Sequence, residues 1–144
     1  MFLGEHQHTL DAKGRVILPA RFRDRLAGGL VFVPGQDRCI DIYPAATFER
    51  RVEELRALPR DDQRARAYLR VFLAGAHQDS PDGQGRVTVP GRLRDYAGLD
   101  RDLTIVGADE KVEVWDRGAW ETYRSDAERA FAELDRLLPV QATP

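Results

Sequence analysis

Short runs of alternating apolar and polar residues open the chain and predict a small β-hairpin. Residues 5–10 and 15–18 have the pattern of two strands. Asp11–Gly14 lies between them and is typical of a turn, because aspartate can accept backbone hydrogen bonds and glycine can adopt a positive φ. Pro19 ends the second strand, since proline has no amide hydrogen for a ladder and its fixed φ suits the start of a helix. The pattern therefore predicts strand, turn, strand and short helix.

The pattern that follows predicts a second hairpin and then helices. Residues 30–33 and 38–43 are apolar enough for two strands, and Pro34-Gly35 between them suits a type II turn. Helical spacing of apolar residues occupies 49–74, where Pro59 divides it into two predicted helices. The same spacing, ending at Leu138, predicts one long amphipathic helix from about 117 to 138.

The first of these patterns occurs twice. Residues 4–24 read GEHQHTLDAKGRVILPARFRD and residues 75–95 read GAHQDSPDGQGRVTVPGRLRD, with 11 of 21 positions identical and no gap. Each copy contains Asp-x-x-Gly-Arg-x-x-x-Pro, and a weaker likeness continues through the second hairpin. An internal repeat of this quality indicates two copies of one structural unit. The predicted division is unit A (1–48), a helical insert (49–74), unit B (75–120) and a C-terminal helix and tail (121–144).

Each unit is too small to be stable alone. A domain of this size rarely holds a core without disulfides or a metal. Cys39 is the single cysteine, so no intramolecular disulfide can form, and we expect this side chain to be a small buried hydrophobe. We therefore expect an α+β fold in which the two units pack about a pseudo-two-fold axis and complete one barrel with their strands.

Charge is unevenly distributed along the chain. The net charge is −2, yet residues 11–25 carry five basic and two acidic groups, whereas residues 109–144 carry five basic and nine acidic groups. Such asymmetry indicates a cationic face suited to nucleic acid. No apolar run is long enough for a membrane span and no basic leader opens the chain, so we expect a cytoplasmic protein with no membrane partner.

Arg15 and Arg86 are the main candidates for contact with double-stranded DNA. Each follows a tight turn, where a planar guanidinium can pair bidentately with a guanine edge or a phosphate. A structural ion pair to Asp11 or Asp82 across the turn is the alternative, and the residues alone favour neither.

The neighbouring positions are further DNA-binding candidates. Lys13 suits a phosphate contact, with a solvated surface charge as the alternative, and Gln84 takes its place in unit B. Gly14 and Gly85 are expected to set the turn conformation. The arginines after each proline are secondary candidates, for which a solvated helix face is the favoured interpretation: Arg21, Arg23, Arg92 and Arg94.

Metal binding and catalysis are not predicted. His6 and His8 share one face of a strand and could in principle bind zinc, but unit B has His77 and then Asp79 in the equivalent positions. Structural histidines are therefore the favoured interpretation. Asp61 and Asp62 have the pattern of a helix N-cap. We expect neither an enzyme nor a cofactor nor a small-molecule substrate.

The two signatures resemble those of a known family. MFLGEHQHTLDAKGRVILPARFRDRL and DGQGRVTVPGRLRDY are similar to the paired signatures of the MraZ family of bacterial transcription regulators, and the resemblance covers essentially the whole chain. It implies two tandem AbrB-like swapped-hairpin units, with Arg15 and Arg86 as the DNA-contacting residues. It also implies ring-shaped homo-oligomers, located at the nucleoid, that bind short direct repeats in the promoter of a division and cell-wall operon containing their own gene and repress it.

One departure and two alternatives follow from the same residues. Lys13 is matched by Gln84, so the two units should not contact DNA equally. A ring-forming scaffold without specific DNA recognition is the main alternative function. An antitoxin is a weaker one, because such proteins usually carry one unit and a disordered tail.

Overall fold

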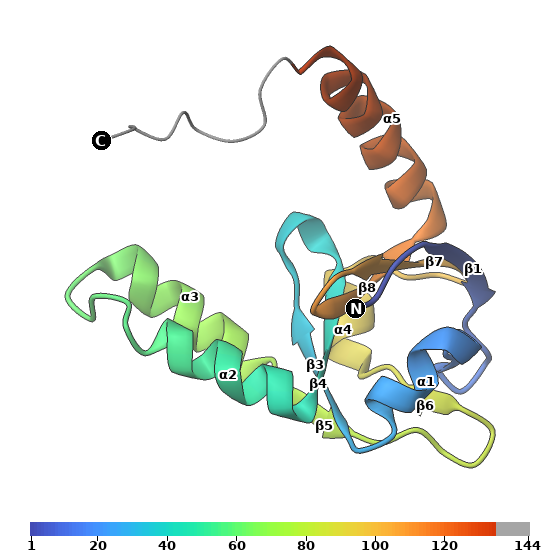
Figure 1. Cartoon of the computed structure of the whole chain (residues 1–144), viewed down its shortest axis with the longest axis horizontal. Helices are drawn as coiled ribbons and strands as arrows, with labels where there is room; N and C mark the ends of the chain where they lie inside the picture. Colours follow the sequence, from blue (N-terminus) through green and yellow to red (C-terminus); the bar gives the residue numbers. More distant parts are fainter. Residues whose placement is uncertain (135–144) are drawn as a thin grey trace.

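The structure, a computed structural model, describes residues 1–134 of the 144-residue chain. It is an α+β fold of antiparallel strands and five α-helices (Figure 1). In chain order the elements are β1 (Glu5–Thr9), β2 (Arg15–Ile17), α1 (Ala20–Leu26), β3 (Leu30–Pro34), η1 (Gln36–Arg38), β4 (Ile40–Pro44), α2 (Ala45–Leu55), α3 (Gln63–Ala74), β5 (His77–Asp79), β6 (Arg86–Thr88), α4 (Gly91–Tyr96), β7 (Asp102–Ala108), β8 (Lys111–Asp116) and α5 (Arg117–Glu133).

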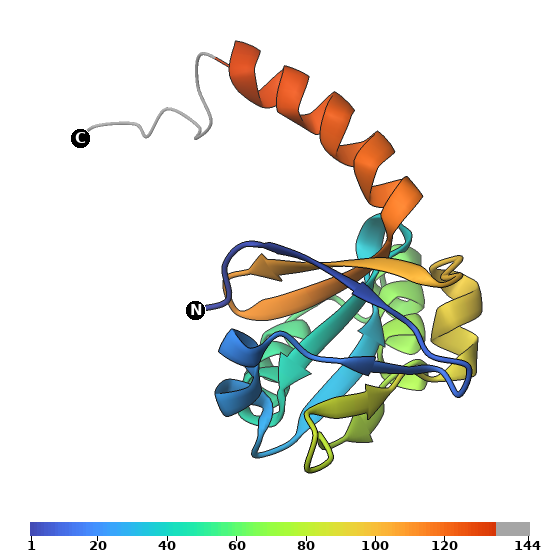
Figure 2. The same ribbon diagram turned by 90° about the vertical axis from the view of Figure 1, so that its right-hand side faces the viewer.

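The strands of the two repeats are exchanged. The main sheet has the order β1-β7-β8-β4-β3-β5, so the first strand of each repeat pairs with the third strand of the other (Figure 2). β4 and β8 meet in the middle, where Asp41 lies opposite Glu113. Swapping the two repeats leaves this order unchanged, which places a pseudo-two-fold axis between β4 and β8.

A closed barrel, which the sequence led us to expect, is not found among the described residues. The six-stranded sheet is open, with β1 and β5 at its edges, and β2 and β6 form a separate two-stranded ladder. β2 and β6 have three residues each and pair with one another, so they do not join the two edges of the larger sheet.

The main core lies between the large sheet, the β2–β6 ladder and the short helices α1 and α4. Phe2, Leu18, Phe32 and Ile105 are fully buried there. The ladder contributes one inward residue from each strand, Val16 and Val87. Because both repeats supply side chains to this core, it is shared between them, as the small size of the units predicted.

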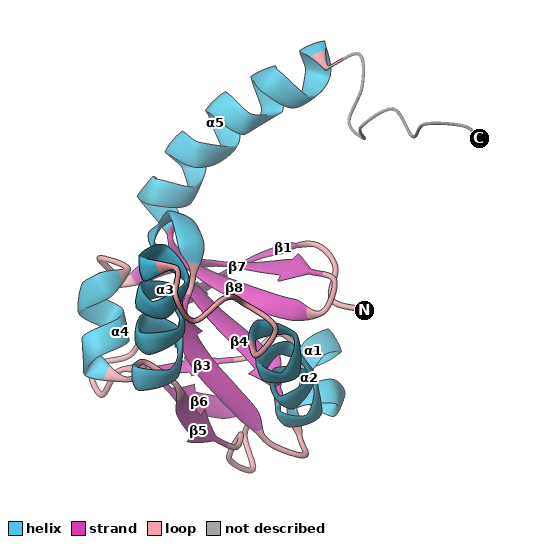
Figure 3. Ribbon diagram, turned by 90° about the vertical axis from the view of Figure 1, so that its left-hand side faces the viewer, coloured by secondary structure: helices cyan, strands magenta, loops and turns pink. Residues whose placement is uncertain are grey.

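A second core lies on the other face of β3 and β4, under the hairpin of α2 and α3 (Figure 3). Val31 and Val33 face it, and Phe72 of α3 stacks on Phe48 of α2. β3 is therefore buried on both faces, which explains its unbroken apolar run. The prediction of two helices separated at Pro59 is confirmed, and Asp62 caps α3 by accepting from the backbone N–H groups of the next turn.

Two predicted boundaries differ from the structure. The turn between β3 and β4 is not a tight type II turn over Pro34-Gly35, because η1 follows and Asp37 and Arg38 both have φ of 62°. The last helix ends at Glu133, since Leu134 has an extended conformation; Leu138 lies outside the described residues.

α2 and α5 are equivalent in the two repeats but differ in how they are covered. Each begins directly after the fourth strand of its repeat. α2 packs with α3, whereas in the described part of the chain α5 projects alone from the sheet and none of its residues is buried (Figure 1). Of the helices in residues 1–134, none combines the length and apolar character needed to cross a membrane.

Candidate nucleic-acid interface

Two nearly identical turns carry the predicted DNA-binding residues. In the first, Asp11 Oδ1 accepts from the backbone N–H groups of Lys13 and Arg15, both at 2.9 Å. The Arg15 guanidinium then donates through Nε to Asp11 Oδ2 at 2.8 Å. The Asp11 carboxylate thus stabilises the turn and also fixes the guanidinium of Arg15, the residue that follows the turn.

The second turn repeats this network. Asp82 Oδ1 accepts from the backbone N–H groups of Gln84 and Arg86 at 2.9 Å, and Arg86 Nε donates to Asp82 Oδ2 at 2.7 Å. The exposed fraction of both arginine side chains is 29%. The two copies therefore present their arginines in the same local geometry, as expected for a conformation that the motif itself determines.

The backbone conformation of each turn requires a glycine. Gly14 has φ of 78° and Gly85 has φ of 76°, a region in which L-residues are strained. Both glycines are buried, because an arginine of the other repeat lies over each of them: Arg94 over Gly14 and Arg23 over Gly85. The carbonyl groups of the two glycines also accept across the repeats, from the N–H groups of Val89 and Leu18 respectively.

The hydrogen bonds to Asp11 and Asp82 lower the pKa of both carboxyl groups. For Asp82 the backbone N–H of Arg86 is the largest cause and the Arg86 guanidinium the second, and with the backbone N–H of Gln84 they lower the pKa to about 2. For Asp11 the backbone N–H of Arg15 is again the main cause of a lower pKa. Both carboxylates are therefore ionised at neutral pH. Among the described residues, this ion pair engages only Nε of each arginine, so its two Nη groups are left for another acceptor.

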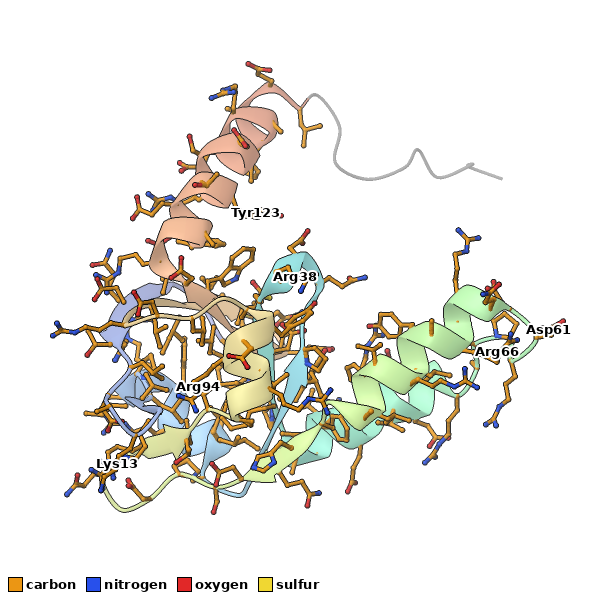
Figure 4. The ribbon with its side chains drawn as sticks, turned by 180° about the vertical axis from the view of Figure 1, so that it is seen from behind. Lys13, Arg38, Asp61, Arg66, Arg94 and Tyr123 are labelled. Atoms are coloured by element: carbon orange, nitrogen blue, oxygen red, sulfur yellow. The ribbon has the colours of Figure 1, made fainter. Side chains whose placement is uncertain are left out.

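The other candidates fall into two groups. Lys13, Gln84, Arg21 and Arg92 are exposed. Figure 4 shows Lys13 at the periphery of the molecule and Arg94 farther inside.

Arg23 and Arg94 are only half-exposed, and the Arg23 Nε donates to the backbone carbonyl of Leu18 at 3.0 Å. The structure therefore brings Arg15, Arg86, Lys13 and Gln84 to the two turns. It gives Arg23 and Arg94 a packing role between the repeats.

The histidines lie at two opposite edges of the main sheet, His6 and His8 on β1 and His77 on β5. His6 packs edge-on against Phe22 with ring centroids 5.1 Å apart, and burial is the main cause of a lowered pKa at His8. β1, with His6, and β5, which begins with His77, form opposite edges of the main sheet. The three histidines therefore do not converge on one place.

A buried charged cluster between β4 and β8 was not predicted from the sequence. Asp41 is 5% exposed, and its carboxylate accepts from Lys111 Nζ at 2.9 Å, while Glu113 lies 3.5 Å from the same nitrogen. Burial raises the pKa of Asp41, and Lys111 partly offsets this. Burial lowers the pKa of Lys111, but Asp41 and the other acidic groups more than compensate and raise it overall.

Cys39 belongs to the same cluster. Its thiol donates to Asp41 Oδ1 at 3.6 Å, and burial followed by the nearby Asp41 raises its pKa. The side chain is 1% exposed, which confirms the expected buried cysteine and identifies an unreactive thiol. The signal for this cluster in the sequence is a single acidic residue inside each of two apolar strands, IDIY and VEVW.

Comparison with known proteins matches both repeats to one family. The family model described as "MraZ protein, putative antitoxin-like" matches residues 1–71 and again 72–139. A "Transcriptional regulator MraZ" of Salinispora arenicola is 57% identical over 96% of this chain and 99% of its own length. The proteins of the same name from Micrococcus luteus and Thermobifida fusca are 54% and 50% identical, each over 96% of this chain and 98% of their own length. The chain therefore belongs to the MraZ family.

Proposed function

We propose that this protein is a sequence-specific DNA-binding transcription regulator. The observation that carries the proposal is the pair of equivalent turns, each holding one half-exposed arginine whose Nη groups are unengaged within the described residues. The relatives' name, transcriptional regulator, supports the same conclusion. The proposed readers are Arg15 and Arg86, which donate through Nη to guanine O6 and N7 while Asp11 and Asp82 fix Nε.

This arrangement joins the two interpretations that the sequence left open. The ion pair to aspartate and the contact to DNA use different nitrogens of one guanidinium. A held arginine loses less side-chain freedom on binding than a mobile one, so the ion pair favours recognition instead of competing with it.

The remaining site residues have different proposed roles. Lys13 contacts phosphate and Gln84 makes an uncharged contact in the second turn. Arg21 and Arg92, which are exposed, add weaker phosphate contacts, whereas Arg23 and Arg94 support the turns from behind together with Gly14 and Gly85. Unit A then has the greater affinity for phosphate.

We further propose that copies of the chain assemble through α5. Tyr123 and Phe131 of α5 are exposed at 43% and 73%, and Leu134 directly after the helix at 54%, which is unusual for a small soluble domain. The groove between α2 and α3 offers three apolar residues, Val52, Leu69 and Leu73, and is rimmed by four basic ones: Arg56, Arg60, Arg66 and Arg70. α5 carries four acidic residues against three basic ones, a small acidic excess that suits this rim, and α5 of one copy docks in the groove of the next.

A head-to-tail contact of this kind generates a closed ring when its rotation closes. In a ring, many weak turns engage one DNA molecule, and avidity supplies affinity that a single turn lacks. We propose that such a ring binds short direct repeats in the promoter of a division and cell-wall operon at the nucleoid, and represses the operon and its own gene.

The proposed architecture follows from the same features. The exchanged pairing of β1 with β7 and of β5 with β3 supports two AbrB-like swapped-hairpin units, taken as 1–48 and 75–120. The helical segments 49–74 and 121–144 then serve assembly.

A scaffold without DNA recognition is the second candidate, and the exposed apolar residues of α5 favour it. A gel shift on DNA upstream of the protein's own gene separates the two, with random DNA of equal length as the control. Specific retention that is lost in Arg15→Ala and Arg86→Ala, with oligomer and fold unchanged, supports regulation. Equal retention of both DNAs by every variant supports the scaffold.

A further inference from the structure

The β2–β6 ladder has one buried face and one solvent-facing face. Val16 and Val87 are 1% and 2% exposed and point into the main core. Because side chains alternate along a strand, the residues on either side of them point outward. Each strand thus contributes two outward residues: Arg15 and Ile17 from β2, and Arg86 and Thr88 from β6.

The register places these four side chains in one compact square. Arg15 lies opposite Thr88, and Ile17 lies opposite Arg86. The two arginines are therefore diagonal neighbours, about 7–8 Å apart. That distance is about two base-pair steps of roughly 3.4 Å.

A ribbon of this size fits a DNA groove. Two strands about 4.8 Å apart, each about 10 Å long, are narrower than the major groove, which is about 12 Å wide and admits a two-stranded ribbon. With the two arginines in the groove, Ile17 and Thr88 occupy the other two corners of the same face and are turned toward the same base edges.

Ile17 is an unusual residue for this place. Its side chain is 47% exposed, and Ile17 lies opposite Arg86 on the face that carries both proposed DNA-reading arginines. The second repeat has Thr88 in the equivalent position, so the pseudo-two-fold symmetry is broken at two opposite corners of the ribbon. The main apolar feature that the major groove offers is the C5-methyl group of thymine.

Building on the proposed function, we propose that Ile17 and Thr88 are specificity-determining residues of the DNA interface. Ile17 selects thymine by apolar contact with its methyl group. Thr88, with a methyl and a hydroxyl group, accepts more than one base. A ribbon with two identical ends would recognise a palindromic DNA sequence. This ribbon has two different ends, so it recognises a non-palindromic sequence.

Other differences between the repeats act in the same sense. Lys13 and His8 of the first repeat correspond to Gln84 and Asp79 of the second, and the Asp79 carboxylate accepts from the backbone N–H of Thr88 at 3.4 Å. The end of the ribbon near Thr88 therefore carries Asp79 and also Lys13, because Arg15 lies opposite Thr88, whereas the other end has His8 and Gln84. The shape of the face and the arrangement of its charges both distinguish its two ends.

The test is a selection of bound sequences from random DNA with the full-length protein, followed by affinity measurements on the selected site. The wild type should select an asymmetric site with thymine at one fixed position. Replacing that thymine by deoxyuridine, which removes the methyl group, should weaken wild-type binding about fourfold, as expected for one buried methyl group. Ile17→Thr should bind both DNAs equally and select a more symmetric site, and Thr88→Ile should gain a thymine preference at the second position.

Leu3→Thr is the control, because Leu3 is 61% exposed and lies outside the ladder; its selected site should match that of the wild type. An unchanged selected site in Ile17→Thr, with Arg15→Ala still inactive, would overturn the proposal and leave the proposed function intact. A lower oligomer mass in Ile17→Thr would also overturn it, since Ile17 would then be a subunit contact. If the wild type selects no sequence at all, the proposed function itself fails.

Discussion

The guanidinium carbon of Arg94 lies 3.0 Å from the position that a Cβ atom on Gly14 would occupy. Arg23 stands over Gly85 in the same way. Each turn of the proposed DNA interface is thus supported from behind by a helix of the other repeat. Any side chain at these glycines must displace an arginine and adopt an unfavourable φ.

Gly14→Ala and Gly85→Ala should therefore each destabilise the fold. The positive φ alone costs about 1–2 kcal/mol, and the displaced arginine adds to this. Urea unfolding monitored by tryptophan fluorescence measures the loss. Gly83→Ala is the matched control, because a Cβ there meets nothing within 4 Å and the first repeat has Ala12 in the same place. Equal stability of Gly85→Ala and Gly83→Ala would contradict the proposed support.

The ion pairs of the turns should make the stability of the fold depend on pH in the acid range. The pKa of Asp82 in the folded protein is about 2, below its ordinary value of 3.8. A carboxyl group with a depressed folded pKa stabilises the fold above its unfolded pKa, and this stabilisation is lost as the pH falls toward 2.

The free energy of unfolding of the wild type should consequently fall between about pH 4 and pH 2, and Asp82→Asn should show a shallower fall. Urea titrations at several pH values measure both slopes. Asp24→Asn, at an exposed aspartate of α1, is the control and should keep the wild-type slope. A slope that Asp82→Asn leaves unchanged would show that the depressed pKa has no consequence for stability.

The turn geometry was the most predictable part of the molecule. The local rule for Asp-x-x-Gly-Arg fixes the aspartate–backbone hydrogen bonds, the positive φ of Gly14 and the half-exposed arginine, because all of these depend on residues within five positions. The repeat itself also predicted that the two units share one core. Both predictions rest on local chemistry or on a direct comparison of the two halves.

Features that depend on distant residues were missed. The open sheet arises because β2 and β6 pair with each other and not with the sheet edges, a choice that no local pattern encodes. Asp41 was not recognised as a buried charge, because its partner Lys111 is 70 positions away. The sequence favoured a solvated helix face for Arg23 and Arg94, because only the tertiary structure places them over the turns of the opposite repeat.

Removing Lys111, the partner of Asp41, should lower the free energy of unfolding. Asp41 is almost fully buried, and Lys111→Met would leave its carboxylate without a counter-charge. Because Lys111 retains some exposure, we expect a loss of about 3 kcal/mol, the lower end for breaking a buried pair. Thermal and urea unfolding measure it. The double variant Asp41→Asn with Lys111→Met should recover much of the loss, and failure of this recovery would mean that the lysine acts by packing alone.

The apolar end of α5 should control assembly. Phe131 is 73% exposed, so Phe131→Glu should leave the fold of the protomer unchanged. If α5 docks in the arginine-rimmed groove of a second copy, this variant should lower the mass measured by light scattering. Leu3→Glu, at a residue with similar exposure outside α5, should not. An unchanged mass in Phe131→Glu would contradict the proposed contact.

The difference between the two turns can be tested by exchanging one residue. Lys13 and Gln84 occupy equivalent exposed positions, and each backbone N–H donates to the aspartate of its turn at 2.9 Å. The exchange therefore changes charge without changing the turn. Each phosphate contact contributes about −0.9 to the slope of log affinity against log salt concentration.

Lys13→Gln should flatten this slope by about 0.9 for each protomer engaged, and Gln84→Lys should steepen it by a similar amount. Because phosphate carries no sequence information, both variants should change affinity for the selected site and for random DNA alike. Salt titrations of both DNAs with both variants provide the measurement. The double exchange, Lys13→Gln with Gln84→Lys, should restore the wild-type slope, since it keeps the number of phosphate contacts. If Lys13→Gln instead weakens only the selected site, Lys13 reads a base and the two turns differ in specificity as well as in charge.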